Sequence, residues 1–156
     1  MKKLTCIAID DEPIALLIIS QFCERKGGLE LTTFSEPLIG LQEIGRCKPD
    51  LVFPRYKAVI FVHGCFWHMH QCPLFRLPAT RTEWWEQKLI QNRQRDLAEQ
   101  DKLREMGWRI LLVWECAIKG RRKIPEAELL AQVAKWLKNG SCYTELPFPE
   151  DEQTTI

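Results

Sequence analysis

The segment KPDLVFPRYKAVIFVHGCFWHMHQC, residues 48–72, sets the organisation of the whole chain. Its apolar runs Leu51–Phe53 and Ala58–Val62 predict two short strands, joined by a tight link at 54–57. Residues 63–72 then hold all three histidines of the chain and two of its seven cysteines. Cysteine and histidine at this density are unusual as core filler, so a functional loop is predicted directly after a buried strand.

The cysteines and one histidine of this loop have the chemistry of a zinc site. Thiolate sulfur and imidazole nitrogen are the ligands that zinc takes in tetrahedral sites. Cys65, His70 and Cys72 can supply three ligands, and Cys116, in Trp114-Glu115-Cys116, can supply the fourth. The spacing C-x4-H-x-C with a remote cysteine is not a standard zinc-finger spacing. From spacing alone two interpretations stay open, a zinc site or a set of unconnected buried thiols and exposed imidazoles.

The rest of this half reads as helix, strand and helix. Thr80-Arg81-Thr82-Glu83 resembles a capping box, and a long helix is expected from there to about Met106, with Gly107 ending it. Residues 108–114 predict a strand, and Pro125 begins a last helix that closes at Asn139-Gly140. Two polar residues, Asn92 and Asp96, interrupt the apolar stripe of the long helix. Either that stretch is solvated, or the two side chains face a polar centre where Asp96 orients a histidine.

Three segments together resemble one family of DNA repair enzymes. They are KPDLVFPRYKAVIFVHGCFWHMHQCPLF (48–75), LPATRTEWW (77–85) and GWRILLVWECAIKG (107–120). From about Lys48 to about Leu137 the chain is similar to the very short patch repair (Vsr) DNA mismatch endonucleases. The resemblance implies a fold like that of type II restriction endonucleases. It also implies a Mg²⁺-dependent nick in one DNA strand beside a T:G mismatch, and a structural zinc.

The resemblance assigns roles to individual residues of this sequence. It implies catalytic roles for Asp50, His63 and His68, with Mg²⁺ held by Asp50 and the carbonyl of Val62. It implies zinc ligation by Cys65, His70, Cys72 and Cys116, and insertion of Phe66, Trp67 and Trp85 into the base stack. The implied partners are mismatched double-stranded DNA and other mismatch-repair proteins. The alternative is a catalytically impaired, zinc-stabilised DNA-binding or pseudo-receiver module, because the N-terminal segment usual in the family is replaced here.

Residues 1–53 resemble something else, the N-terminal half of a response-regulator receiver domain of the type that precedes LytTR domains. The pattern is a strand at 4–9, the acids of IAIDDEP, a helix at 14–25, a strand at 29–34 and a helix from Ser35 to about Cys47. Asp10 and Asp11 match the receiver's acidic pocket. Arg55 stands where the phosphoacceptor is expected, so phosphorylation of this chain is not expected.

The chain is therefore interpreted as chimeric, with an α/β fold. A flavodoxin-like, receiver-like βαβα segment (1–47) precedes an endonuclease-like core (48–140) and an acidic tail (141–156) predicted to be disordered. We expect a mixed sheet of about five or six strands with flanking helices. The receiver-like strands should pair parallel to Leu51–Phe53 on one side, and Ala58–Val62 should pair antiparallel on the other.

Composition bounds the class of protein. The 156 residues are 46% hydrophobic and 28% charged, which is typical of a globular chain, and no apolar run has membrane-spanning length. The net charge of +1 is uneven, since residues 50–145 carry 16 basic and 11 acidic side chains and residues 146–156 carry three acidic and no basic ones. A basic middle suits nucleic acid. The odd cysteine count beside a metal-like cluster favours a reducing bacterial cytoplasm, with association to the nucleoid during action.

Overall fold

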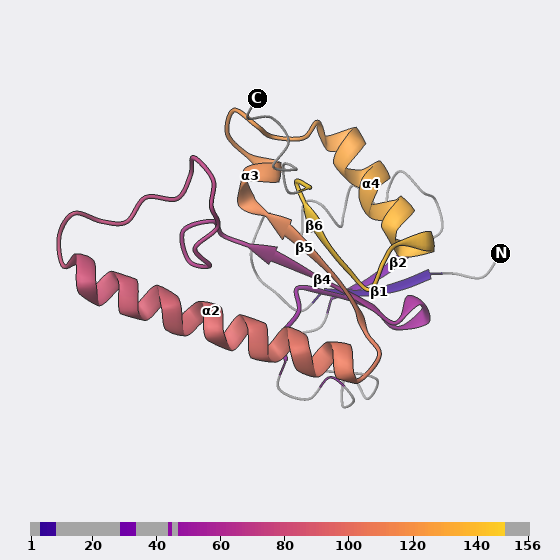
Figure 1. The fold of residues 1–156 in the computed structure, drawn as a ribbon. Coiled ribbons are helices and arrows are strands. Elements are labelled where there is room, and N and C mark those ends of the chain that lie inside the picture. Colours follow the sequence, from indigo (N-terminus) through magenta and orange to yellow (C-terminus); the bar gives the residue numbers. More distant parts are fainter. Residues whose placement is uncertain (1–3, 9–28, 34–43, 45–46, 149–156) are drawn as a thin grey trace, which may run out of the picture.

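One mixed sheet organises the molecule (Figure 1). The structure, a computed structural model, describes residues 4–8, 29–33, 44 and 47–148. The strands are β1 (Leu4–Ala8), β2 (Leu29–Thr33), β3 (Leu51–Phe53), β4 (Ala58–His63), β5 (Arg109–Trp114) and β6 (Tyr143–Leu146), in the order β2-β1-β3-β4-β5-β6. β4, β5 and β6 run parallel, and β3 runs antiparallel to β4. The predicted α/β class is confirmed.

The two longest strands, β4 and β5, are apolar along almost their whole length. AVIFVH in β4 and RILLVW in β5 bury side chains on both faces, as strands covered by layers on both sides do. They pair from Ala58↔Arg109 to His63↔Trp114. Because parallel strands end at the same edge of a sheet, the loop after β4 and the turn after β5 meet there. This pairing brings Cys116 next to the 63–72 loop, although about fifty residues separate them in sequence.

Helices cover the two faces of the sheet (Figure 1). α4 (Glu126–Asn139) buries Leu129, Val133 and Trp136 against one face, together with Ile60 and Leu111. The long α2 (Thr82–Glu105) covers the other face through Leu103, which packs with side chains such as Phe61 and Leu112. Each fully buried Leu, Ile, Val or Phe contributes about 1.5–3 kcal/mol to stability. The alternation along β4 and β5 thus holds a three-layer arrangement of helix, sheet and helix.

The ends of α2 differ in how well the sequence predicts them. Gly107, with φ of 80°, donates its N–H to the carbonyl of Arg104, and Trp108 donates to the carbonyl of Leu103. This is a Schellman motif, so the predicted glycine stop is confirmed. The predicted capping box is wrong, because Arg81 is the N-cap, in a left-handed conformation with no side-chain cap bond. Thr82 bonds backward instead, through Oγ1, to the carbonyls of Pro78 and Ala79.

Two expectations about the N- and C-terminal parts of the chain need correction, and a third falls mostly outside the described residues. β1 and β2 pair parallel as expected, but β1 pairs antiparallel with β3. A strand of three residues such as β3 buries the same side chains in either direction, so its apolar pattern cannot fix its direction. The disorder predicted for 141–156 is wrong at β6, which pairs in parallel register with β5, whereas residues 149–156 lie outside the described residues. The helices expected at 14–25 and 35–47 lie outside the described residues, apart from Ile44 and Cys47. None of the helices in the described ranges is long and apolar enough to cross a membrane.

Candidate active centre and metal site

A cavity of about 490 Å³ opens where β4 ends. It is lined by the three residues implied to be catalytic and by two of the three implied DNA wedges: Asp50, His63, His68, Phe66 and Trp67. Asp96 of α2 also lines it. Side chains that lie up to 46 positions apart in the sequence, from Asp50 to Asp96, thus line one cavity, which is the arrangement expected of an active site.

Asp50 reaches this cavity because of the antiparallel pairing of β3 with β4. Leu51 pairs with Ile60, so the residue before β3 lies beside the end of β4. The backbone N–H of Val62 donates a 2.5 Å hydrogen bond to Asp50 Oδ2. The bond fixes the carboxylate of Asp50 at the mouth of the strand pair. The residues predicted to hold Mg²⁺ are therefore in direct contact, through the amide rather than the carbonyl of Val62.

The two histidines of the cavity stack on one another. The rings of His63 and His68 lie 3.8 Å apart and are almost parallel, at 6°. His68 Nδ1 lies 2.5 Å from Asp96 Oδ2, the contact foreseen for Asp96. Burial, and then the neighbouring His68, lower the pKa of His63 to about 3, so this ring is neutral near pH 7. The cavity therefore holds one imidazole tied to a carboxylate and one neutral imidazole stacked against it.

Asn92 has a different contact from Asp96. Its Nδ2 donates to the carbonyl of Trp67 at 3.4 Å, and Arg95 donates to its Oδ1. Asn92 thus holds the backbone of the aromatic loop and touches neither histidine. The choice left open by the sequence is resolved toward the polar centre for Asp96, which lines the cavity and meets His68, but not for Asn92.

Aromatic side chains gather on the other side of the same loop. Phe66, Trp67 and Trp85 contact one another, with ring centroids 5.2–6.1 Å apart. Trp67 remains 49% exposed although it is a large apolar side chain. Trp84 packs edge-on to Trp85 at 4.9 Å and lies under the cations of Arg81 and Lys88. An exposed indole braced by half-buried aromatic neighbours is suited to contact another flat, apolar surface.

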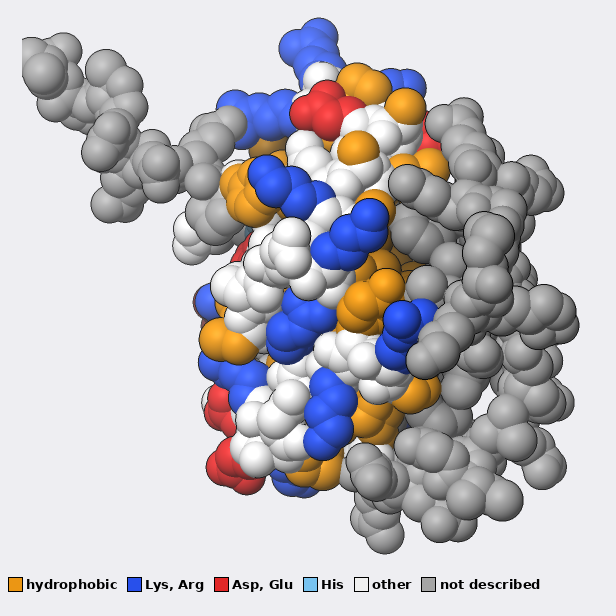
Figure 2. Space-filling view, turned by 90° about the vertical axis from the view of Figure 1, so that its right-hand side faces the viewer, with side chains coloured by type: hydrophobic (Ala, Val, Ile, Leu, Met, Phe, Trp, Pro, Cys, Tyr) orange, Lys and Arg blue, Asp and Glu red, His pale blue; other side chains and the backbone are white. Residues whose placement is uncertain are grey.

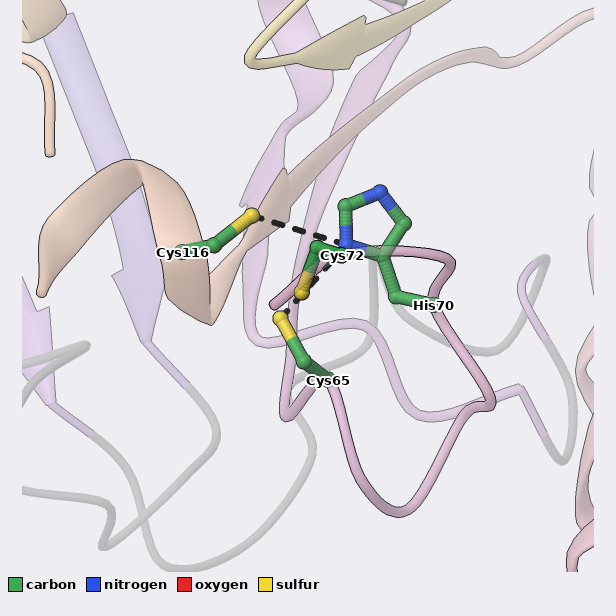
Figure 3. A group of neighbouring side chains, drawn as sticks. All are labelled: Cys65, His70, Cys72 and Cys116. Carbon is green, nitrogen blue, oxygen red and sulfur yellow. Dashed lines mark hydrogen bonds between the residues drawn. The ribbon is translucent and has the colours of Figure 1, made fainter. Parts of the chain in front are cut away.

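The four residues predicted to bind zinc come together beside the cavity (Figure 3). The ligand atoms of Cys65, His70, Cys72 and Cys116 all lie within 4.8 Å of one another. His70 Nδ1 is 3.5 Å from Cys65 Sγ and 3.5 Å from Cys116 Sγ. A tetrahedral zinc, with bonds of about 2.3 Å to sulfur and 2.0–2.1 Å to nitrogen, would place the ligand nitrogen about 3.5–3.6 Å from each ligand sulfur. The donor set and its spacing fit zinc, and the interpretation as scattered thiols is wrong for these residues.

The pKa shifts of these side chains also fit a site for a metal cation. Burial raises the pKa of the Cys65 and Cys116 thiols, so they would stay protonated on their own. Burial lowers the pKa of His70, which keeps its ring neutral and able to bind metal. A divalent cation offsets the cost of burying thiolates, so a cation bound here would stabilise the site.

Two acidic residues support the site, although neither was predicted to do so from the sequence. Glu115 accepts the Cys65 N–H at 3.0 Å and also pairs with Lys119. Burial raises the pKa of Glu115, but the bonds from Lys119 and the Cys65 amide outweigh it, and the pKa falls below its usual value. Glu145 accepts the indole N–H of Trp114 at 2.8 Å. Position before a ligand cysteine was a possible signal for Glu115, whereas Glu145 lies in a segment that looked like a polar tail.

The comparisons with known proteins concern this same part of the chain. Residues 43–74 match the family model of the DNA mismatch endonuclease Vsr. The DNA mismatch endonuclease Vsr of Escherichia coli (strain K12) is 49% identical over 90 residues, 58% of each chain. The type II nicking enzyme V.NmeAIP of Neisseria meningitidis serogroup A is 39% identical over 74 residues, 47% of this chain and 53% of its own. V.XorIIP of Xanthomonas oryzae pv. oryzae is 46% identical over 70 residues, 45% of this chain and 52% of its own.

This chain is thus similar to mismatch and nicking endonucleases over the segment that carries its site. The matched segments span about half to three fifths of the length of these relatives. The family model covers Asp50, both cavity histidines and three of the four metal-site residues. The receiver-like interpretation of residues 1–53 stays a prediction.

Proposed function

We propose that this chain is a metal-dependent DNA endonuclease that nicks one strand beside a T:G mismatch. The observation that carries the proposal is the shared cavity, where Asp50 and the His68–Asp96 pair lie beside an exposed aromatic group. Similarity to proteins named as mismatch and nicking endonucleases supports it. The same proposal implies action in the cytoplasm and, as candidate partners, other mismatch-repair proteins.

Asp50 is the residue that we propose for the catalytic metal. Mg²⁺ prefers oxygen ligands and usually keeps several waters, with one or two carboxylates and substrate phosphates completing its shell. A single, well-fixed carboxylate that opens onto a cavity fits this requirement, with the carbonyl of Val62 as a second ligand. Bound there, Mg²⁺ supplies charge stabilisation for the phosphate and an activated water.

His68 is the residue that we propose for proton transfer. A carboxylate only accepts hydrogen bonds, so Asp96 fixes the proton of His68 on Nδ1 and leaves Nε2 as the basic atom. An imidazole held in one tautomer and one orientation can take a proton from water or return it to a leaving oxygen. Neutral His63, stacked beneath it, keeps the ring in place and adds no competing positive charge.

The Cys65–His70–Cys72–Cys116 cluster has a structural role in this proposal. Its ligands flank His68 in sequence, so zinc bound there would fix both ends of the segment that carries the proton-transfer group. All four positions are taken by protein atoms, which leaves no open position for substrate. Zinc is thus assigned to holding the loop and Mg²⁺ to the chemistry.

Recognition of the mismatch is assigned to the aromatic group. Phe66, Trp67 and Trp85 together present a braced, partly exposed wedge, and wedges of this kind insert between base steps and unstack them. A mismatched pair costs less to unstack than a matched one, which would give selectivity. Figure 2 shows Lys and Arg side chains spread over one face of the molecule, as contact with a polyanion requires.

The alternative is a zinc-stabilised module that binds DNA or a protein partner without cutting. The limited coverage of the relatives favours it, because residues 1–42 lie outside the matched family model. The receiver-like part would then serve as a pseudo-receiver, and Asp10 and Asp11 would be candidate ligands for a cation. They lie outside the described residues.

One assay separates the two functions. The purified chain should nick a T:G duplex in the presence of Mg²⁺, spare the T:A duplex of the same sequence, and stop when EDTA is added. Asp101→Asn changes an exposed carboxylate on α2 that bonds only Arg104 among the described contacts, and it serves as the control for Asp50→Asn. Preferential binding of T:G without any nick, at all Mg²⁺ concentrations, would refute the enzyme and leave the binding module.

A further inference from the structure

The indole of Trp114 lies between the metal cluster and the paired histidines. It stacks on His70 with ring centroids 4.2 Å apart and planes only 5° from parallel. Its other contacts are edge-on, to His63 at 5.4 Å and to His68 at 6.5 Å. Trp114 is 7% exposed, so this ring is part of the packed interior. One side chain therefore touches a predicted zinc ligand and both histidines of the cavity.

The plane of this indole is set from β6. Trp114 Nε1–H donates to Glu145 Oε2 at 2.8 Å, and Tyr143 O–H donates to Glu145 Oε1 at 2.5 Å. Both carboxylate oxygens are thus engaged. The parallel register that places Glu145 beside Leu112 brings the carboxylate to the indole. An indole can turn about its side-chain bonds, and this hydrogen bond selects the orientation in which the ring lies flat on His70.

The bond is not a general consequence of burying tryptophan in this fold. Trp108 and Trp136 are also buried, and within the described part of the chain their Nε1–H groups have no hydrogen-bond partner. Those two rings are held by packing, and that of Trp136 also by the Arg109 cation 4.9 Å from its centroid. Trp114 differs because its donor meets a carboxylate whose other oxygen is held as well, and charged acceptors make the stronger hydrogen bonds.

We propose that Glu145 is a positioning residue that acts through Trp114 on His70 and on the histidines of the active centre. The catalytic part of this inference rests on the proposed endonuclease function, while the effect on the metal site does not. Side chains that orient a metal ligand typically change metal affinity or activity by about 10–100-fold when they are lost. The last strand of the sheet would thereby be required for the chemistry at the end of β4.

The test uses four variants of the full chain. Glu145→Ala removes the acceptor, Glu145→Gln keeps an acceptor oxygen, and Trp114→Phe keeps a stacking ring that needs no acceptor. Thr144→Val is the control on the same strand, because it removes only a bond to Ser141 on the opposite side of β6. The readouts are the rate of zinc loss to EDTA, the ring-proton NMR shifts of His70, and single-turnover nicking with separately measured DNA affinity.

We expect Glu145→Ala to lose zinc about 10–100-fold faster and to nick more slowly by a similar factor, with DNA affinity unchanged. In Glu145→Gln both the rate of zinc loss and the rate of nicking should lie close to the parental values. Combining Glu145→Ala with Trp114→Phe should add little to Trp114→Phe alone, since the proposed route from the carboxylate to the histidines runs through the indole. Equal effects of Glu145→Ala and Thr144→Val, or full additivity with Trp114→Phe, would overturn the inference.

Failure of the proposed function leaves the inference testable. If the parent chain never nicks DNA, the rate of zinc loss still decides the matter. If the parent also holds no zinc, the His70 ring-proton shifts decide it: Glu145→Ala should move them, whereas Glu145→Gln, which loses the charge but keeps the acceptor, and Thr144→Val should leave them near the parental values. Unmoved His70 shifts in Glu145→Ala would refute the positioning role.

Discussion

Removing the Asp96 carboxylate tests the proposed active centre most directly. Asp96 lies on α2 and reaches His68 Nδ1 at 2.5 Å, and its side chain is 23% exposed. In Asp96→Ala the imidazole loses the acceptor that fixes its tautomer and orientation. The ring stays in the cavity, since it still stacks on His63 at 3.8 Å. The change therefore removes orientation without removing the proton-transfer group.

The expected loss of nicking rate follows from the strength of the hydrogen bond between His68 and Asp96. A hydrogen bond to a charged group contributes about 1.5–3 kcal/mol, and each ~1.4 kcal/mol is tenfold in rate, so full expression in the transition state gives about 10- to 150-fold slower nicking. The nicking rate should fall less in Asp96→Asn, because the amide oxygen still accepts the hydrogen bond from His68 Nδ1–H. DNA affinity should remain within about twofold, since the carboxylate is proposed to act on a proton and not on a phosphate.

Single-turnover nicking of a T:G duplex, with binding measured by gel shift, checks these values. Asp101→Ala is the matched control, because it removes a carboxylate from the same helix that bonds Arg104 at 2.8 Å. His68→Ala should slow nicking by ~10²–10⁴-fold, and adding Asp96→Ala to it should have no further effect. Nicking by Asp96→Ala at the parental rate, or additive losses in the double variant, would show that Asp96 does not act through His68.

Four further outcomes are expected. Asp50→Asn should cut nicking by orders of magnitude while T:G affinity stays level or rises, since one charge that binds metal and repels phosphate is gone; single-turnover rates and gel shifts measure both. Trp67→Ala should weaken T:G binding by about 1–3 kcal/mol, and an unchanged T:G preference in gel shifts would contradict the wedge. Cys116→Ser should lower zinc content below one per chain and destabilise residues 48–148, as elemental analysis and limited proteolysis would report. Arg109→Met should cost about 2–3 kcal/mol in urea unfolding, because Arg109 bonds the carbonyls of Trp136 and Leu137 at the end of α4.

The sequence predicts the centre of this fold better than its flanks, for physical reasons. β4 and β5 are continuous apolar runs, and Gly107 has the conformation that ends α2, so local chemistry determines these features. β6 escaped prediction because Tyr143-Thr144-Glu145-Leu146 lies at a sheet edge, where its register against β5 supplies the order that its composition does not. The direction of β3 relative to β1 likewise depends on pairing and not on the three side chains of β3.

The residues of the site likewise divide into those that the sequence indicates and those that it does not. Cys65, His70 and Cys72 share one loop, so their spacing made them candidate ligands together with Cys116, and the family resemblance decided between a metal site and unconnected thiols. Asp96 was visible as a polar break in an apolar stripe, although its partner could not be read from α2. Glu115 and Glu145 contact the site through a backbone amide and an indole, and neither kind of contact leaves a pattern in sequence.

The loop after β4 explains why the metal cluster and the active centre occur together. Within residues 63–72, His63 and His68 serve the cavity, while Cys65, His70 and Cys72 serve the metal cluster. Its backbone is held by turns, with His68 N–H donating to Gly64 at 3.2 Å and His70 N–H donating to Cys65 at 3.0 Å. Turns of this kind fix a loop weakly, and in the proposed mechanism His68 would need an accuracy of a fraction of an ångström to move a proton. A metal bound by ligands on both sides of His68, together with the contacts to Asp96 from α2 and Trp114 from β5, would supply that accuracy from rigid elements.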